Sequence, residues 1–188
     1  PHTLTMLERI VHDMRLFKSP AELKLMRHAA QTSARAHTYA MQICEPGLYE
    51  YELDAVFAHE FRQDNMQAAY TTIVGGGKNA CILHYIENNA RLQDGDLVLI
   101  DAGAEYDCYA SDITRTFPVN GRFSPEQRAL YQIVLDAQQA AIAAAQPGNT
   151  WDDPHQAVVK VLAQGLIDVG ILQGSLEDAL KVPDRVAG

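Results

Sequence analysis

The stretch LVLIDAGAEYDCYASDITRTF, residues 97–117, decides the fold. It opens with four consecutive apolar residues, 97–100, a run typical of a strand buried on both faces. Asp101 follows this run directly. A second extended segment is expected from Cys108 to about Val119, where an Asn-Gly turn signal follows. Together the two segments predict an antiparallel hairpin.

The register of this hairpin decides where two carboxylates lie. If the chain turns near Tyr106 and Asp107, Asp101 pairs directly with Asp112. Opposed residues point to the same face of a sheet, with Cβ atoms roughly 5 Å apart. A β-bulge in either strand would remove this argument. We therefore expect the carboxylates of Asp101 and Asp112 to converge.

Two converging carboxylates can share a proton, which raises one pKa, or they can bind cations that keep both ionised. Oxygen ligands suit Mg²⁺, Mn²⁺ and similar ions, and a centre of two such ions is a common way to use paired carboxylates. In the alternative, Asp112 pairs with Arg115, and Asp101 accepts hydrogen bonds from turn amides. Spacing alone leaves both interpretations open.

Helices flank the strands. Ser19, Pro20 and Glu22 form a capping-box pattern with proline in the first turn, so they predict a helix that stops before Pro46. The helical pattern recurs over 50–63, 124–147, about 150–169 and in a short stretch from 175. Residues 70–74 predict another strand, whereas the weak periodicity of residues 1–15 predicts a connecting segment. This order predicts an α+β fold with an antiparallel sheet covered by helices.

Composition narrows the function classes. The 188 residues hold 15 Lys and Arg against 24 Asp and Glu, and 47% are hydrophobic, which fits one globular domain or a large piece of one. The net charge of −9 argues against nucleic acid and anionic membranes as partners. Most of the acidic excess lies in residues 91–188, which suggests a cation site there. No apolar run reaches the roughly 20 residues of a membrane span, and no signal peptide is visible, so the cytoplasm is expected.

Cysteine and histidine usage adds two expectations. Three cysteines without CxxC spacing predict reduced, mostly buried thiols: Cys44, Cys81 and Cys108. His84 sits in an apolar run, where a satisfied core histidine is the alternative to a catalytic one. His155 is interpreted as structural, and the remaining histidines have no partner pattern: His2, His12, His28, His37 and His59.

Four segments together resemble the catalytic domain of the Xaa-Pro aminopeptidase (aminopeptidase P) branch of the methionine aminopeptidase and creatinase superfamily, peptidase family M24. They are IVHDMRLFKSPAELKLMRHA, TTIVGGGKNACILHY, DGDLVLIDAGAEYDCYASDITRTFPVNGRFSPEQR and GLIDVGIL. The resemblance runs from about Val11 to Gly174. It implies the pita-bread fold around two divalent metal ions, usually manganese, and release of an N-terminal residue that precedes proline.

The resemblance also implies roles for single residues. Asp101 matches the first metal-ligating aspartate of the family, and Asp112 matches the bridging second one. His84 matches the histidine that contacts the substrate and stabilises the tetrahedral intermediate. In this family a hydroxide bridging the metals attacks the scissile carbonyl. The implied partners are peptides with proline at the second position, and formation of a homo-oligomer is left open.

The sequence departs from the family in one respect. The family uses one further His and two Glu ligands, in motifs resembling HGxxHxxG and VEPG, and residues 171–188 contain neither. We therefore expect an incomplete and inactive piece: residues 1–15 as a linker from a preceding domain, and residues 16–188 as the N-terminal part of the catalytic domain. Cys108 stands where relatives commonly have glycine.

Two alternative functions remain at this stage. A non-enzymatic member of the same fold would use the cleft to bind a peptide or a partner, although such a module has no need for converging carboxylates. A prolidase-like enzyme would act on dipeptides instead of longer peptides.

Overall fold

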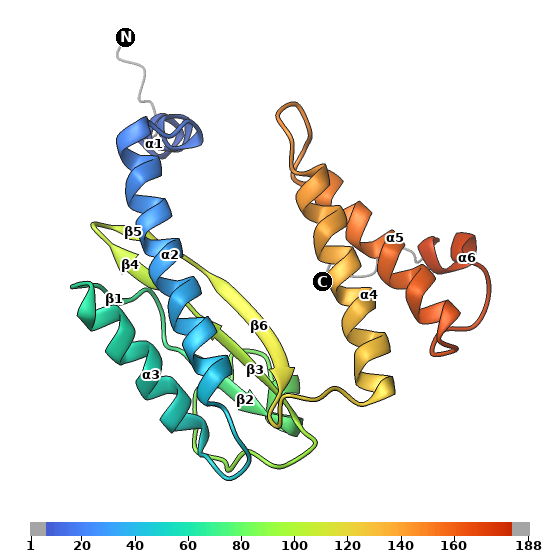
Figure 1. Ribbon diagram of the computed structural model, residues 1–188. Helices are drawn as coiled ribbons and strands as arrows, with labels where there is room; N and C mark the ends of the chain where they lie inside the picture. The colour runs from blue at the N-terminus through green and yellow to red at the C-terminus, as the bar shows by residue number, and fades with distance from the viewer. Residues whose placement is uncertain (1–6, 182–188) are drawn as a thin grey trace. The chain divides into compact units, whose positions relative to one another are not determined.

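The computed structural model describes residues 7–181, and the chain divides into two compact units, Pro1–Arg122 and Phe123–Gly188. The helices of the first unit are α1 (Leu7–Leu16), α2 (Pro20–Ile43), α3 (Glu50–Gln63) and the short 3₁₀ helix η1 (Gly77–Cys81). Its strands are β1 (Gln67–Ala68), β2 (Ile73–Gly76), β3 (Leu97–Ala102), β4 (Ala104–Tyr106), β5 (Tyr109–Ala110) and β6 (Ile113–Pro118). The second unit contains α4 (Pro125–Ala144), α5 (Asp152–Asp168) and α6 (Leu176–Leu180) (Figure 1).

The predicted helix caps are confirmed. The Ser19 amide donates to Glu22 Oε2 at 2.6 Å, and the Glu22 amide donates to Ser19 Oγ at 3.3 Å, which closes the capping box of α2. Helix α3 has the predicted bounds. Arg35 on α2 forms ion pairs with Glu60 and Asp64 of the α3 end, at 3.0 and 2.8 Å.

Helix α1 gives regular structure to residues 7–15 of the predicted connecting segment 1–15. Apolar side chains occur at helical spacing at Leu7, Ile10, Val11 and Met14. This helix has 10 residues, fewer than the 11–18 over which a helical period is usually clear. Its apolar side chains are exposed in the first unit. The first six residues of the predicted linker 1–15 lie outside the described residues.

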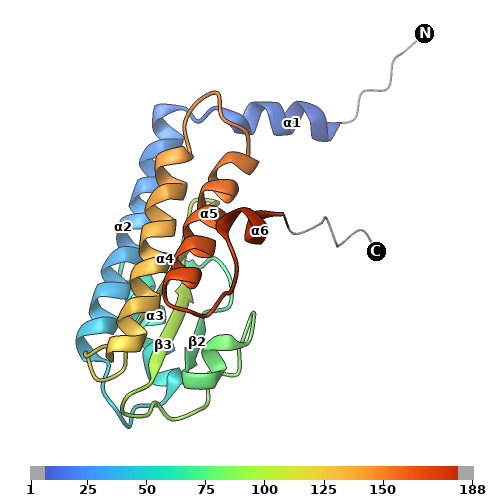
Figure 2. The ribbon, with the colours of Figure 1, turned by 90° about the vertical axis from the view of Figure 1, so that its right-hand side faces the viewer.

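The strands form two antiparallel sheets, with orders β2-β3-β6 and β1-β4-β5. Figure 2 shows β2 and β3 side by side. Helices α2 and α3 pack against each other and against the strands. The core lies between these layers and includes Leu53, Phe57, Phe61, Val98 and Ile100. The predicted antiparallel sheet covered by helices is therefore confirmed.

Strand β3 is buried less evenly than expected. Val98 and Ile100 are fully buried against the core, whereas Leu97, Leu99 and Asp101 on the opposite face are half-buried. The prediction that this strand is buried on both faces was thus wrong, within the first unit, for one of the two faces of β3. That half-open face is the one that carries Asp101.

The hairpin turns one residue later than predicted. Its two-residue loop is Asp107–Cys108, with φ of +47° and +69°, the left-handed backbone of a type I′ turn. Moving a turn by one residue moves every pairing by two, so Asp101 pairs with Thr114 and not with Asp112. The expected single strand from Cys108 is also split into β5 and β6. Glycine tolerates the left-handed backbone of Cys108 better than other residues do.

In the second unit, α4 and α5 pack closely. A Cβ on Gly165 of α5 would lie 2.5 Å from Ile133 Cγ2 of α4, so only glycine permits this approach. Helix α6 packs on α5. The helices predicted over 124–147, 150–169 and from 175 are confirmed.

All three cysteines are free, as predicted, but two are not buried. Cys108 is exposed because it occupies the hairpin turn, and Cys81 is exposed at the end of η1. Cys44 is half-buried, and burial raises the pKa of its thiol to about 11. The expectation of mostly buried thiols holds only in part.

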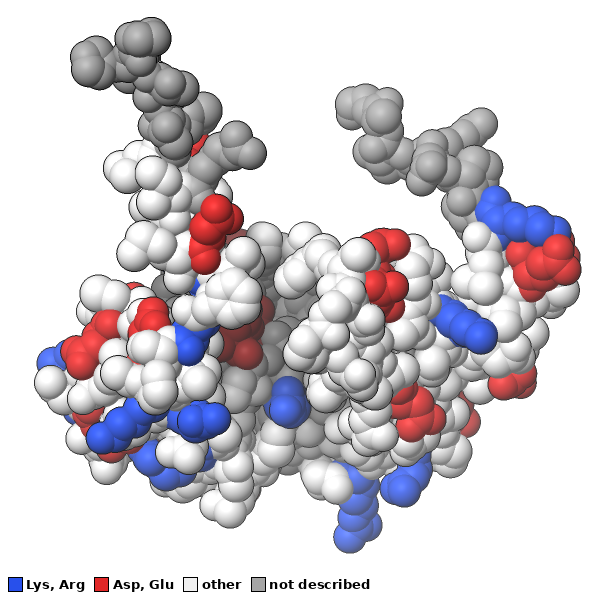
Figure 3. Space-filling view, turned by 90° about the horizontal axis from the view of Figure 1, so that it is seen from above, with Lys and Arg blue, Asp and Glu red and all other residues white. Residues whose placement is uncertain are grey.

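The described surface is mixed in charge. On the face shown in Figure 3, acidic and basic side chains are interspersed among uncharged ones. Among residues 7–181, no helix combines the length and apolar character that crossing a membrane requires.

Candidate metal centre

The structure brings Asp101 and Asp112 together. Tyr70, which precedes β2, places its hydroxyl between the two carboxylates. The hydroxyl donates to Asp101 Oδ1 at 2.6 Å, and its oxygen lies 3.1 Å from Asp112 Oδ1. Asp101 is the fifth residue of β3, and Asp112 directly precedes β6. Two carboxylates therefore meet around one hydroxyl oxygen.

The convergence survives the error in the predicted register. Asp101 is opposite Thr114, and Asp112 lies two residues before Thr114. Side chains two residues apart on a strand share a face, so Asp112 is the diagonal neighbour of Asp101 instead of its direct partner. The face was predicted correctly because the register error was an even number of residues.

Gly103 allows the backbones to cross beside the two carboxylates. A Cβ at this position would lie 1.8 Å from the carbonyl oxygen of Ser111 and 3.2 Å from Asp112 Cα. No side chain fits there. The crossing ends the β3–β6 ladder at Ala102 and leaves Asp112 between two strands.

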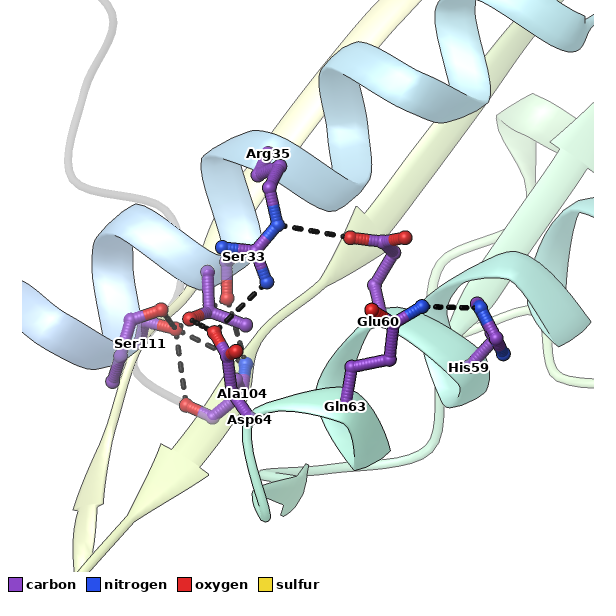
Figure 4. A network of polar contacts seen from close by, with 10 residues as sticks. Ser33, Arg35, His59, Glu60, Gln63, Asp64, Ala104 and Ser111 are labelled. Carbon is purple, nitrogen blue, oxygen red and sulfur yellow. Dashed lines mark hydrogen bonds and ion pairs between the residues drawn. The ribbon is translucent and has the colours of Figure 1, made fainter.

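A buried pair of serines fixes the residue before Asp112. Ser33 Oγ on α2 lies 2.7 Å from Ser111 Oγ, and the Ala104 amide donates to both hydroxyls, at 2.8 and 3.1 Å. Figure 4 shows Ser33 and Ser111 meeting beside Ala104. Because buried hydroxyls keep their partners, this cluster holds the start of β6 against α2. Sequence reasoning missed it, since it joins segments more than 70 residues apart.

The electrostatics of the pair also involve Tyr70. Burial, together with the hydrogen bonds to Asp101 and Asp112, raises the pKa of Tyr70 above its ordinary value. The hydroxyl therefore keeps its proton at neutral pH and remains a donor. The sequence placed Tyr70 only in a strand and gave no sign of this contact.

The alternative partner of Asp112 is not used. Arg115 donates from Nη1 to the neighbouring Thr114 carbonyl at 2.7 Å and forms no ion pair with Asp112. Asp101 accepts a hydrogen bond from Tyr70 instead of from turn amides. The interpretation in which both carboxylates are satisfied locally was thus wrong.

His84 lies on the loop between η1 and β3. The His84 side chain is exposed, so the interpretation of His84 as a core histidine is wrong for the first unit. Its backbone is left-handed, with a φ of +57°. Within residues 7–181 the imidazole makes no hydrogen bond or ion pair, so the structure does not join it to the two aspartates. His155 is exposed on α5.

The residues present fit part of a site for hard divalent cations. Two carboxylate oxygens converge where a polar hydrogen now lies, and oxygen ligands are those that Mg²⁺ and Mn²⁺ prefer. Among residues 7–181, no group of three or more His, Cys, Asp or Glu side chains is arranged to hold an ion. The described residues thus offer two anionic ligands.

Comparison with known proteins points to one family. The model of metallopeptidase family M24 matches residues 24–181. The Xaa-Pro aminopeptidase of Escherichia coli is 46% identical over 96% of this chain and 41% of its own length. That of Haemophilus influenzae is 49% identical over 92% of this chain and 40% of its own length. The chain therefore spans about two fifths of the length of these curated relatives.

A solved structure supports the same conclusion. The Pseudomonas aeruginosa aminopeptidase PepP is 55% identical, with a TM-score of 0.90 over 92% of this chain and 39% of that one. The α+β fold is thus that of the matching part of aminopeptidase P, the pita-bread fold. Because the family model matches residues 24–181, most of its length, the chain belongs to metallopeptidase family M24.

Proposed function

We propose that this chain forms part of the catalytic domain of an Xaa-Pro aminopeptidase, which removes the N-terminal residue of peptides that carry proline in second position. The observation that carries the proposal is the meeting of Asp101 and Asp112 at the Tyr70 hydroxyl. Family membership and the names of the relatives support the same reaction. The cytoplasm is the proposed location.

Asp101 and Asp112 would hold two divalent metal ions, which we propose to be manganese. When bound, the ions supply an activated water and polarise the scissile carbonyl. The two carboxylates concentrate negative charge at one point of a half-open sheet face, and the Tyr70 hydroxyl orients both of them. A further His and two Glu ligands are proposed to come from sequence outside the 188 residues.

His84 is proposed to donate a hydrogen bond near the carbonyl oxygen as negative charge develops on it. A preorganised donor at this position stabilises the transition state. The exposed imidazole, which has no partner within residues 7–181, is available for this task. Its exposure also means that substrate reaches it without a rearrangement of the first unit.

The test uses the polypeptide read from the complete coding sequence, loaded with Mn²⁺. We expect it to cleave an Xaa-Pro-Xaa peptide and to leave the matched Xaa-Ala-Xaa peptide intact. Asp112→Asn should lower kcat/KM about a thousandfold, the effect of losing several kcal/mol of metal catalysis. The control Asp107→Asn changes an exposed turn residue and should leave the rate unchanged.

Other results would overturn the proposal in distinct ways. Cleavage of Xaa-Pro dipeptides alone would assign a prolidase. Peptide binding without hydrolysis by the metal-loaded protein would assign a binding module. The 188-residue chain alone is expected to be inactive, and manganese-dependent release of the first residue by this chain would contradict the proposed need for further ligands.

A further inference from the structure

A buried carboxylate lies outside the candidate metal centre. Glu50 is the first residue of α3, and its side chain is fully buried in the first unit. An isolated carboxylate in such a place costs several kcal/mol, so it requires compensation. No Lys or Arg forms an ion pair with Glu50 within residues 7–181. Hydrogen-bond donors and the N-terminal end of α3 must therefore balance its charge.

Four donors fill both oxygens of Glu50. Oε1 accepts from the Gly76 amide at 2.8 Å and from Asn79 Nδ2 at 3.0 Å. Oε2 accepts from the Tyr85 hydroxyl at 2.8 Å and from the Ala90 amide at 2.9 Å. All four donors belong to residues 76–90, and two of them, Tyr85 and Ala90, lie in the loop that carries His84. One side chain from a helix thus holds both ends of the segment 76–90.

The contacts within the loop point the same way. Asn79 Nδ2 also donates to the Tyr85 hydroxyl, at 3.1 Å. The Asn88 side chain accepts from the Val74 amide at 3.0 Å and donates to the Thr72 carbonyl at 2.8 Å. It thereby satisfies backbone groups at the edge of β2 that has no neighbouring strand. Tyr85 and Asn88 are buried, whereas His84 is exposed. The loop is therefore fixed at points on either side of an outward-facing histidine.

His84 needs such support. A left-handed backbone is unfavourable for a residue other than glycine, so the loop must impose it on His84. Tyr85, the next residue, anchors the backbone directly through Glu50. Burial and the hydrogen bond to Glu50 raise the pKa of Tyr85, so its hydroxyl remains a donor. Loss of the anchor would release His84 toward more ordinary backbone conformations.

We propose that Glu50, acting through Tyr85, is a positioning residue that holds His84 in the conformation required for catalysis, an assignment that rests on the proposed function. Glu50 itself touches neither substrate nor metal in this account. Its effect on the reaction passes through His84 alone. Dependence on His84 alone distinguishes a positioning role of Glu50 from a general contribution to the stability of the fold.

A double-mutant cycle in the complete, Mn²⁺-loaded protein tests this restriction. Tyr85→Phe removes one hydrogen bond to a charged group and should lower kcat/KM about tenfold. In the His84→Ala background the same change should alter kcat/KM less than about twofold, because the group it positions is gone. The matched controls, Tyr51→Phe and Glu87→Gln, change exposed side chains and should have no effect in either background.

Amide hydrogen exchange gives a readout independent of activity. Glu50→Gln should speed exchange at the Gly76 and Ala90 amides about tenfold or more, and Glu87→Gln should not. A tenfold loss from Tyr85→Phe in both backgrounds would overturn the positioning role. So would unchanged exchange at those two amides in Glu50→Gln. An inactive parent protein would instead count against the proposed function, so the two failures are distinguishable.

Discussion

The Tyr70 hydroxyl lies 2.6 Å from Asp101 Oδ1 and at the same time contacts Asp112, so it occupies the point at which the two carboxylates meet. Like charges at short range repel, and a shared donor offsets part of that repulsion. The Tyr70 hydroxyl therefore holds the two carboxylates together at the point where a cation would bind.

Tyr70→Phe should destabilise the metal-free protein by about 1–3 kcal/mol, because the half-buried carboxylate of Asp101 and the exposed one of Asp112 lose their common donor. Excess Mn²⁺ should reduce this loss, since a cation would balance the same charges. Urea unfolding with and without Mn²⁺ measures both values. Equal destabilisation in the two conditions would show that Tyr70 acts apart from the cation site.

Gly103→Ala should cost about 3 kcal/mol or more, because its Cβ would overlap the Ser111 carbonyl oxygen and force the backbones apart. Gly95→Ala is the matched control. Gly95 has a φ of +85°, and a Cβ added there would meet no atom within 4 Å. The control should therefore lose only about 1–2 kcal/mol of stability, through backbone strain alone. Similar losses for the two variants in chemical denaturation would contradict the close crossing beside Asp112.

The stability of the protein should fall as the pH drops below about 6.5, the ordinary pKa of histidine. Burial lowers the pKa of His37, whose Nε2 lies 3.2 Å from the Ala102 carbonyl, so the unfolded chain takes up a proton more readily than the folded one. This stability is fully present above pH 6.5 and is lost below it, at most at about 1.4 kcal/mol per pH unit.

His37→Gln should therefore flatten the dependence of unfolding free energy on pH between 7 and 5.5. His155→Gln changes an exposed histidine and serves as the control. Parallel profiles for the parent and His37→Gln would exclude His37 as the source.

Local signals in the sequence predicted most of the helices and the antiparallel pairing of the strands. The capping box at Ser19 and Glu22 gave the start of α2, because the interaction spans three residues. The convergence of Asp101 and Asp112 was predictable because strand geometry fixes the face even when the register is off by two. The turn itself was misplaced, since neither Asp107 nor Cys108 is the glycine that marks a type I′ turn most clearly.

Contacts between distant segments could not be predicted in this way. Tyr70 reaches Asp112 across 42 positions, and Glu50 reaches Tyr85 across 35. No periodicity encodes such pairs, because they depend on how the layers pack. The family resemblance supplied roles for Asp101, Asp112 and His84, whereas the residues that orient them emerged only from the fold.

We propose above all that Asp101 and Asp112 are ligands of one dinuclear cation site. Calorimetric titration of the metal-free complete protein with MnCl₂ tests it most directly, with Asp101→Asn, Asp112→Asn and the control Asp107→Asn. We predict that the parent and Asp107→Asn bind two manganese ions per chain. In Asp101→Asn and Asp112→Asn the affinity for manganese should be weaker by at least about 10–100-fold, because loss of a metal ligand should cost at least as much as loss of an outer-shell partner. Unchanged manganese binding in Asp101→Asn and Asp112→Asn would contradict the claim.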